Sequence, residues 1–150
     1  MKVAMRVGMV AFAALALAGA AMAQPQLHSQ DGLRWVSGGV TNEERGELVM
    51  LLPDHNLKLV TSAERSGAYL TDVGLVILDS RGAKVLETRL DGPWFLARLP
   101  TGRYELMLTH NGVTQKRVMT IPATGRRDGY FYWKDAASAD EPVPEGSRKP

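Results

Sequence analysis

The side chains best suited to chemistry in this chain are three histidines, His28, His55 and His110. No two of them stand two or four residues apart, the spacings that bring two imidazoles to one metal ion from a single strand or helix. Asp54 and His55 would supply half of a metal site, but they follow a predicted helix. A histidine near the C-terminal end of a helix is favoured by the helix dipole. The sequence therefore predicts neither a metal nor a cofactor.

Nucleophilic catalysis needs a serine or cysteine beside a base. The chain has no cysteine, and Ser62, Ser66 and Ser80 fall in predicted turns without a Gly-x-Ser-x-Gly pattern. Asp72 and Asp79 flank one predicted strand near its opposite ends, which suits solvated strand ends better than paired acid–base work. We therefore assign no catalytic residue and expect no enzyme. The alternative is a small hydrolase or metal-dependent enzyme whose site is built from scattered loop residues.

Two basic pairs, at 116–117 and 126–127, precede an aromatic run at 130–133. Proteins that bind single-stranded nucleic acid combine such features. The chain has 18 Lys and Arg against 16 Asp and Glu, and Lys2 and Arg6 of the N-terminal leader account for the difference. The rest of the chain is electrically balanced, so we expect no nucleic-acid partner.

The aromatic run is the least ordinary feature of the sequence. Strand alternation places Phe131 and Trp133 on one face and Tyr130 and Tyr132 on the other. One pair is expected in the core, and the other is expected to cover the sheet surface. If the run is an edge strand, it can accept an extended partner segment by strand addition. Tyr130 and Tyr132 are then the candidate partner edge; the alternative is a strand inside the sheet followed by a mere spacer.

The first 23 residues have the pattern of a signal peptide. Lys2 and Arg6 precede an apolar run, and Ala21-Met22-Ala23 forms a cleavage site of the small-x-small type. The apolar run is too short for the roughly 20 residues that span a bilayer. We expect cleavage before Gln24, a periplasmic or secreted product, and no stable membrane insertion after cleavage.

Two alternating runs, Trp94–Leu99 and Tyr104–Leu108, are joined by the residues Leu99-Pro100-Thr101-Gly102. Pro100 has no N–H to donate and presets the φ angle of a turn, which Gly102 closes. The sequence therefore predicts a hairpin with a structural turn motif of Leu99, Pro100, Gly102 and Tyr104. The Tyr104 hydroxyl is expected to bond back to the backbone, as in the tyrosine corner of other sandwiches.

One helix is predicted at 42–52, because Thr41 and Glu44 have the spacing of a capping box and Pro53 ends the helical run. The other periodic segments alternate with a period of two and indicate strands. They lie at 33–36, 56–63, 69–79, 83–90, 113–121 and 130–133. Residues 24–32 are expected to form a flexible entry, and residues 135–150 a disordered tail.

About seven short strands with turns every 8–12 residues indicate an all-β sandwich over residues 33–134, with the helix added. The turn motif Leu99-Pro100-x-Gly102-x-Tyr104, preceded by a strand and a Gly-Pro turn, resembles the carboxypeptidase regulatory-like family. Small secreted proteobacterial members share the pattern that includes Ser37-Gly38-Gly39. The resemblance implies a seven-stranded prealbumin-like (transthyretin-like, Ig-like) fold.

The same resemblance implies an accessory or binding module with no chemistry of its own. Some prealbumin-like proteins hydrolyse hydroxyisourate and carry a characteristic C-terminal tetrapeptide, which residues 146–150 do not match. We therefore expect a non-catalytic module of the cell envelope. Its partner would be an envelope protein or a peptide segment held by strand addition.

Overall fold

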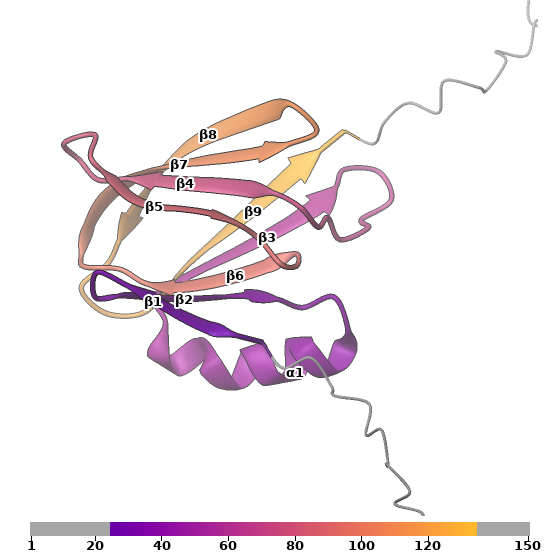
Figure 1. Ribbon diagram of the computed structural model, residues 1–150, viewed down its shortest axis with the longest axis horizontal. Helices are drawn as coiled ribbons and strands as arrows, with labels where there is room; N and C mark the ends of the chain where they lie inside the picture. The colour runs from indigo at the N-terminus through magenta and orange to yellow at the C-terminus, as the bar shows by residue number, and fades with distance from the viewer. Residues whose placement is uncertain (1–24, 135–150) are drawn as a thin grey trace, which may run out of the picture.

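Two β-sheets packed face to face form the body of the computed structural model, which describes residues 25–134 (Figure 1). Sheet A has the strand order β1-β2-β6-β3-β9, and sheet B has the order β5-β4-β7-β8. The strands of sheet A are β1 (Leu27–Gln30), β2 (Leu33–Gly38), β3 (Leu57–Ala63), β6 (Trp94–Arg98) and β9 (Arg127–Trp133). Those of sheet B are β4 (Gly74–Leu78), β5 (Lys84–Arg89), β7 (Gly102–His110) and β8 (Val113–Ile121). The expected β-sandwich class is therefore confirmed.

The described residues form nine strands where the sequence predicts about seven. The prediction of a flexible entry over residues 24–32 is wrong, because residues 27–30 form the strand β1, which pairs antiparallel with β2. Asp31 and Gly32 both have positive φ angles, of 50° and 81°, and so form the two-residue turn that a hairpin requires. An Asp-Gly turn followed by alternating residues is the signal that this prediction overlooked.

The strand predicted over residues 69–79 is also too long. The ladder of β4 begins only at Gly74, because Asp72 has a φ angle of 63° and breaks the extended backbone. Tyr69 still makes one isolated bridge, to Ser62. Ser62 itself lies within β3 and is buried, so the turn predicted for it is wrong. The chain thus bends between β3 and β4 and passes from sheet A to sheet B.

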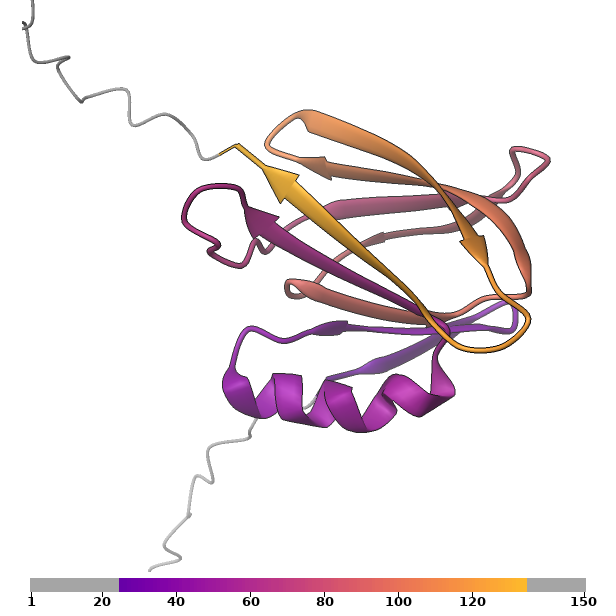
Figure 2. The same ribbon diagram turned by 180° about the vertical axis from the view of Figure 1, so that it is seen from behind.

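The helix α1 (Asn42–Leu51) covers the outer face of sheet A, on the side away from sheet B (Figures 1 and 2). The predicted capping box is confirmed: the Glu44 amide donates to Thr41 Oγ1, and the Glu44 carboxylate accepts from the Thr41 amide. A short 3₁₀ turn, η1 (Leu52–Asp54), replaces the last predicted helical residue. Leu48 is fully buried against Val36 and Leu96, which attaches the helix to β2 and β6.

The main core lies between the two sheets. The alternation of each strand sends one set of side chains inward, and Phe95, Phe131, Leu106 and Leu108 are each at most 1% exposed. The hairpin predicted from the two runs around the turn motif is wrong, because β6 belongs to sheet A and β7 to sheet B. The turn instead carries the chain from one sheet to the other, at one side of this core. Gly102 has a φ angle of 156°, in a region that L side chains rarely adopt. The Tyr104 hydroxyl donates to the Pro100 carbonyl oxygen at 2.8 Å, so the predicted tyrosine contact is confirmed.

Neither the predicted signal peptide at 1–23 nor the predicted tail at 135–150 belongs to the described residues. Between residues 25 and 134, no helix is both long enough and apolar enough to span a bilayer.

Candidate functional site

The strand β9 lies at the free end of sheet A, beside β3 and parallel to it. Phe131 and Trp133 are 0% and 5% exposed and face the core, whereas Tyr130 and Tyr132 are 45% and 54% exposed. The predicted division of the aromatic run into a core pair and a surface pair is therefore confirmed. The outward pair is not under the helix, because α1 covers β2 and β6.

The backbone of β9 uses alternate residues to pair with β3. The Arg127 amide donates to the Asn56 carbonyl, and the Trp133 carbonyl accepts from the Glu64 amide. In a parallel ladder the residues in between direct their amide and carbonyl groups to the opposite side. The outward groups of β9 therefore belong to Asp128, Tyr130 and Tyr132, and we call this side of the strand the β9 edge.

Two side chains of β8 occupy the carbonyl groups of the β9 edge. Arg117 Nη1 donates to the Tyr130 carbonyl oxygen at 3.0 Å, and Gln115 Nε2 donates to the Tyr132 carbonyl oxygen. The Arg117 guanidinium also lies over the Phe131 ring, 4.2 Å from its centroid. Natural β-proteins blunt their sheet edges with such side chains. Gln115 and Arg117 therefore occupy hydrogen-bonding groups of the edge that the sequence proposes as a partner site. We call these two side chains the guard residues.

The contacts of β8 with β9 continue beyond these two side chains. Trp133 Nε1 donates to the Val113 carbonyl oxygen at 3.1 Å. At the other end, Gly129 leaves room for Met119: a Cβ atom there would lie 3.1 Å from the Met119 sulfur. The alternation of β8 places Gln115, Arg117 and Met119 on one face. That periodicity was the available signal for these residues, but nothing in the sequence shows that β9 lies opposite.

A histidine, a serine and an aspartate do meet, but in an arrangement unsuited to nucleophilic catalysis. Ser37 Oγ donates to Asp91 Oδ2 at 3.3 Å and accepts from the Asp91 amide at 2.9 Å. His28 Nε2 lies 3.9 Å from Asp91 Oδ2. The carboxylate therefore stands between the imidazole and the hydroxyl, whereas a nucleophilic serine needs the base at hydrogen-bond distance. The sequence reasoning did not find this cluster, because its members come from β1, β2 and a distant loop.

The other two histidines lie far apart in the fold. His55 is 6% exposed and shares a 2.7 Å hydrogen bond between Nδ1 and the Leu51 carbonyl, where it caps the C-terminal end of α1. His110 is at the β7–β8 turn and packs edge-on against Trp133. Across the described part of the chain, no three His, Asp or Glu side chains gather as metal ligands would.

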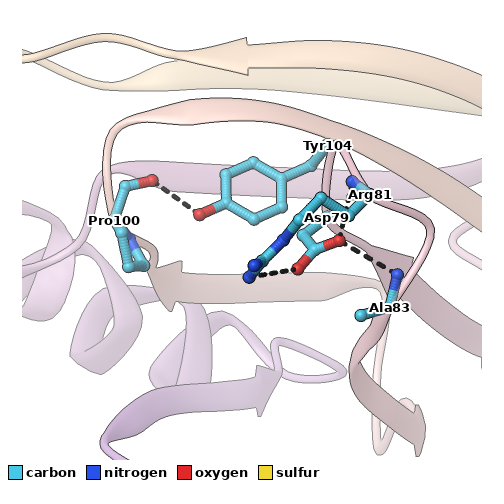
Figure 3. Close-up of polar contacts among 5 residues, drawn as sticks. All are labelled: Asp79, Arg81, Ala83, Pro100 and Tyr104. Carbon is cyan, nitrogen blue, oxygen red and sulfur yellow. Dashed lines mark hydrogen bonds and ion pairs between the residues drawn. The ribbon is translucent and has the colours of Figure 1, made fainter.

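The acidic residues at the two ends of the predicted strand have separate structural roles. Asp72 pairs with Arg89. Asp79 closes the β4–β5 turn, because its Oδ1 accepts from the amides of Arg81 and Ala83, each at 2.9 Å (Figure 3). The hydrogen bond from the Ala83 amide is the main cause that lowers the pKa of Asp79.

Tyr104 lies beside this turn in Figure 3, with its hydroxyl directed at Pro100. Burial raises the pKa of Tyr104, and the charge of Asp79 adds to the effect. Both groups are thus used to hold turns in place.

One arginine of each basic pair is bonded to an acceptor within the fold. Arg117 contacts β9, and Arg126 pairs with Asp128 at 2.6 Å.

Neither a scan against protein-family models nor a search of curated proteins finds a match to this chain.

Proposed function

We propose that this protein is a non-catalytic binding module of the cell envelope that holds an extended segment of a partner protein along the β9 edge. The observation that carries the proposal is the position of β9. It is the last strand of sheet A, and two adjacent outward positions of this edge strand carry exposed tyrosines. Tyrosines contribute large contact areas at low entropic cost, which suits them to recognition.

The resemblance of the Leu99–Tyr104 turn to carboxypeptidase regulatory-like domains supports a prealbumin-like class and an accessory role. The arrangement of His28, Ser37 and Asp91 does not favour the alternative of a hydrolase, because the Ser37 hydroxyl is bonded to the Asp91 carboxylate and not to the imidazole. A sandwich fold alone does not identify a function, so the proposed function depends on the β9 edge.

A partner strand would displace the side chains of Gln115 and Arg117 from the β9 edge at a small cost in free energy. The Arg117 side chain is exposed and the Gln115 side chain is half-buried, so both can turn into solvent. An incoming strand would then replace one side-chain donor at each tyrosine carbonyl with a backbone amide. The number of hydrogen bonds at the edge is conserved, and contacts with Tyr130 and Tyr132 are added.

The test is capture of an envelope protein by the purified, immobilised chain, with the bound protein identified by mass spectrometry. Tyr130→Lys with Tyr132→Lys should abolish capture and change the free energy of unfolding by no more than about 0.5 kcal/mol. The matched control is Val40→Lys with Met50→Lys, which alters two exposed apolar side chains near α1. Equal capture by both double variants would refute the β9 edge, as would unfolding of the tyrosine variant.

The location in the envelope is tested separately by the intact mass of the exported protein. Cleavage between Ala23 and Gln24 predicts a mass without residues 1–23. A mass that retains them would contradict the proposed periplasmic location of a cleaved product.

A further inference from the structure

A hollow of about 310 Å³ opens at the end of the sandwich, where β3 ends, β7 turns into β8, and β9 leaves the sheet. Its lining includes Trp133 but neither Tyr130 nor Tyr132. An adjoining hollow, lined by Tyr132 and Glu64, shares Val113, Trp133 and Lys134 with it. Its lining residues are Ala63, Leu70, His110, Asn111, Val113, Trp133 and Lys134. The volume falls at the lower end of the range for small-molecule sites.

The walls of this hollow are apolar. Leu70 packs against the main core, and Val113 is 56% exposed. The indole of Trp133 already uses its only polar atom, because Nε1 donates to the Val113 carbonyl. A ligand therefore meets hydrocarbon and aromatic surface on these sides, which favours an apolar body.

The polar side chains of the hollow are an imidazole, a carboxamide and an ammonium group, from His110, Asn111 and Lys134. Asn111 Nδ2 lies 3.3 Å from His110 Nε2. An amide nitrogen can only donate, so Nε2 accepts and the proton of the neutral imidazole is on Nδ1. His110 Nδ1 is buried and has no hydrogen-bond partner within residues 25–134. A buried donor without an acceptor is uncommon and costly. The His110 ring must rotate toward the hollow before a ligand oxygen can reach Nδ1, and the hydrogen bond formed there would remove that cost.

Lys134 adds a positive charge at the same hollow, and none of the lining residues that the structure describes is acidic. A ligand that matches these features has a negatively charged acceptor at one end and an apolar group at the other. We propose that this hollow binds a small carboxylic acid with an aromatic or branched aliphatic body. The carboxylate would accept from His110 and lie near Lys134, and the apolar body would pack on Trp133, Leu70 and Val113.

The experiment titrates the full exported chain with 3-phenylpropionate and follows the Trp133 indole N–H and the His110 amide by NMR. For a ligand of this size we expect saturable shifts with a dissociation constant on the order of 1 mM or tighter. Two comparison probes separate the two ends of the ligand: 3-phenylpropan-1-ol lacks the charge, and acetate lacks the apolar body. Each should bind at least about tenfold more weakly.

Two substitutions test the donors, and one serves as a control. Lys134→Gln removes the charge at nearly constant length, and His110→Phe keeps a ring against Trp133 without a donor. Each should weaken binding of 3-phenylpropionate about three- to tenfold. Lys116→Gln removes a lysine of β8 that is outside the hollow and should leave the dissociation constant unchanged.

Several outcomes would overturn the proposal. They are equal binding of the acid and the alcohol, shifts that map away from Trp133, and the absence of shifts up to about 10 mM probe. If His110→Phe fails to fold, an unchanged dissociation constant in Lys134→Gln is sufficient to reject the carboxylate. The result is independent of the β9 edge, because the tyrosine double variant keeps every lining residue of the hollow.

Discussion

The side-chain amide of Asn56 makes two hydrogen bonds to the backbone of Leu99. Nδ2 donates to the Leu99 carbonyl at 2.7 Å, and Oδ1 accepts from the Leu99 amide at 2.9 Å. The backbone of Asn56 is used as well, since its amide donates to Ala97 and its carbonyl accepts from Arg127. One buried residue thus joins β6 and its turn to the start of β3 and β9.

Asn56→Ala should therefore lower the free energy of unfolding by about 2–4 kcal/mol, because it leaves the buried amide and carbonyl of Leu99 without partners. Denaturant unfolding measures the change. The control is Gln30→Ala at an exposed position, which should remain within about 0.5 kcal/mol of the wild type. Equal midpoints for the two variants would show that the Asn56 contacts contribute nothing.

Tyr104→Phe should cost about 0.5–1.5 kcal/mol at neutral pH, because it removes the hydrogen bond to Pro100 and keeps the ring in place. The difference should narrow in alkali. Burial raises the pKa of Tyr104 above its ordinary value of 10.0, so the wild type holds the proton more tightly when folded. That stabilisation is complete below the unfolded pKa and is lost as the pH rises through the folded pKa. Unfolding curves at about pH 8 and pH 11 test this, and a constant difference would contradict it.

Asp79→Ala should destabilise the protein more at neutral pH than in acid. The amides of Ala83 and Arg81 bind the charged carboxylate and lower its pKa. The sign is opposite to that of Tyr104: the stabilisation is present above the unfolded pKa and is lost as the pH falls through the folded pKa. Asp79→Asn keeps an acceptor oxygen without the charge and should fall between the wild type and the alanine variant. Parallel pH profiles for the wild type and Asp79→Ala would disprove the role of ionisation.

A pair of glycine substitutions should shift stability in opposite directions. A Cβ atom on Gly92 would lie 2.4 Å from the backbone of Gly38, which cannot move without disturbing β2. We expect Gly92→Ala to cost more than about 2 kcal/mol. Gly46 has open space around it within α1, so Gly46→Ala should stabilise the protein by about 0.5–1 kcal/mol. Thermal melts of both variants give the comparison, and a destabilised Gly46→Ala would be inconsistent with the helix.

Removing the two guard side chains, Gln115 and Arg117, should expose backbone groups of the β9 edge without disturbing the core. Gln115→Ala with Arg117→Ala frees the carbonyl groups of Tyr130 and Tyr132, and an exposed edge is a template for pairing with another strand. If the proposed partner site is correct, the double variant should capture the envelope partner more strongly than the wild type does. Lys116→Ala with Val118→Ala, on the other face of β8, is the control. Weaker capture by the guard variant would mean that these side chains belong to the binding surface itself.

Several features were predictable because they depend on residues close together in the chain. The capping box needs only Thr41 and Glu44, and the Tyr104 contact with Pro100 spans one turn. The division of the aromatic run into Phe131 with Trp133 and Tyr130 with Tyr132 follows from alternation within β9, although alternation does not show which pair is buried. In each case the geometry is determined by local backbone preferences, whichever strand lies next to the segment.

Local patterns did not reveal which distant segments meet, or where the backbone departs from its periodicity. Asp72 ends the predicted strand because its φ angle is positive, and nothing in its alternating neighbours indicates this. The parallel pairing of β9 with β3, the approach of Gln115 and Arg117 to the β9 edge, and the hollow beside Trp133 all depend on how the two sheets stack. By itself the sequence determined the β-rich composition, the helix and which side chains of each strand share a face. Only the tertiary structure decided which edges and side chains come together, because those pairings are selected by packing across the whole core.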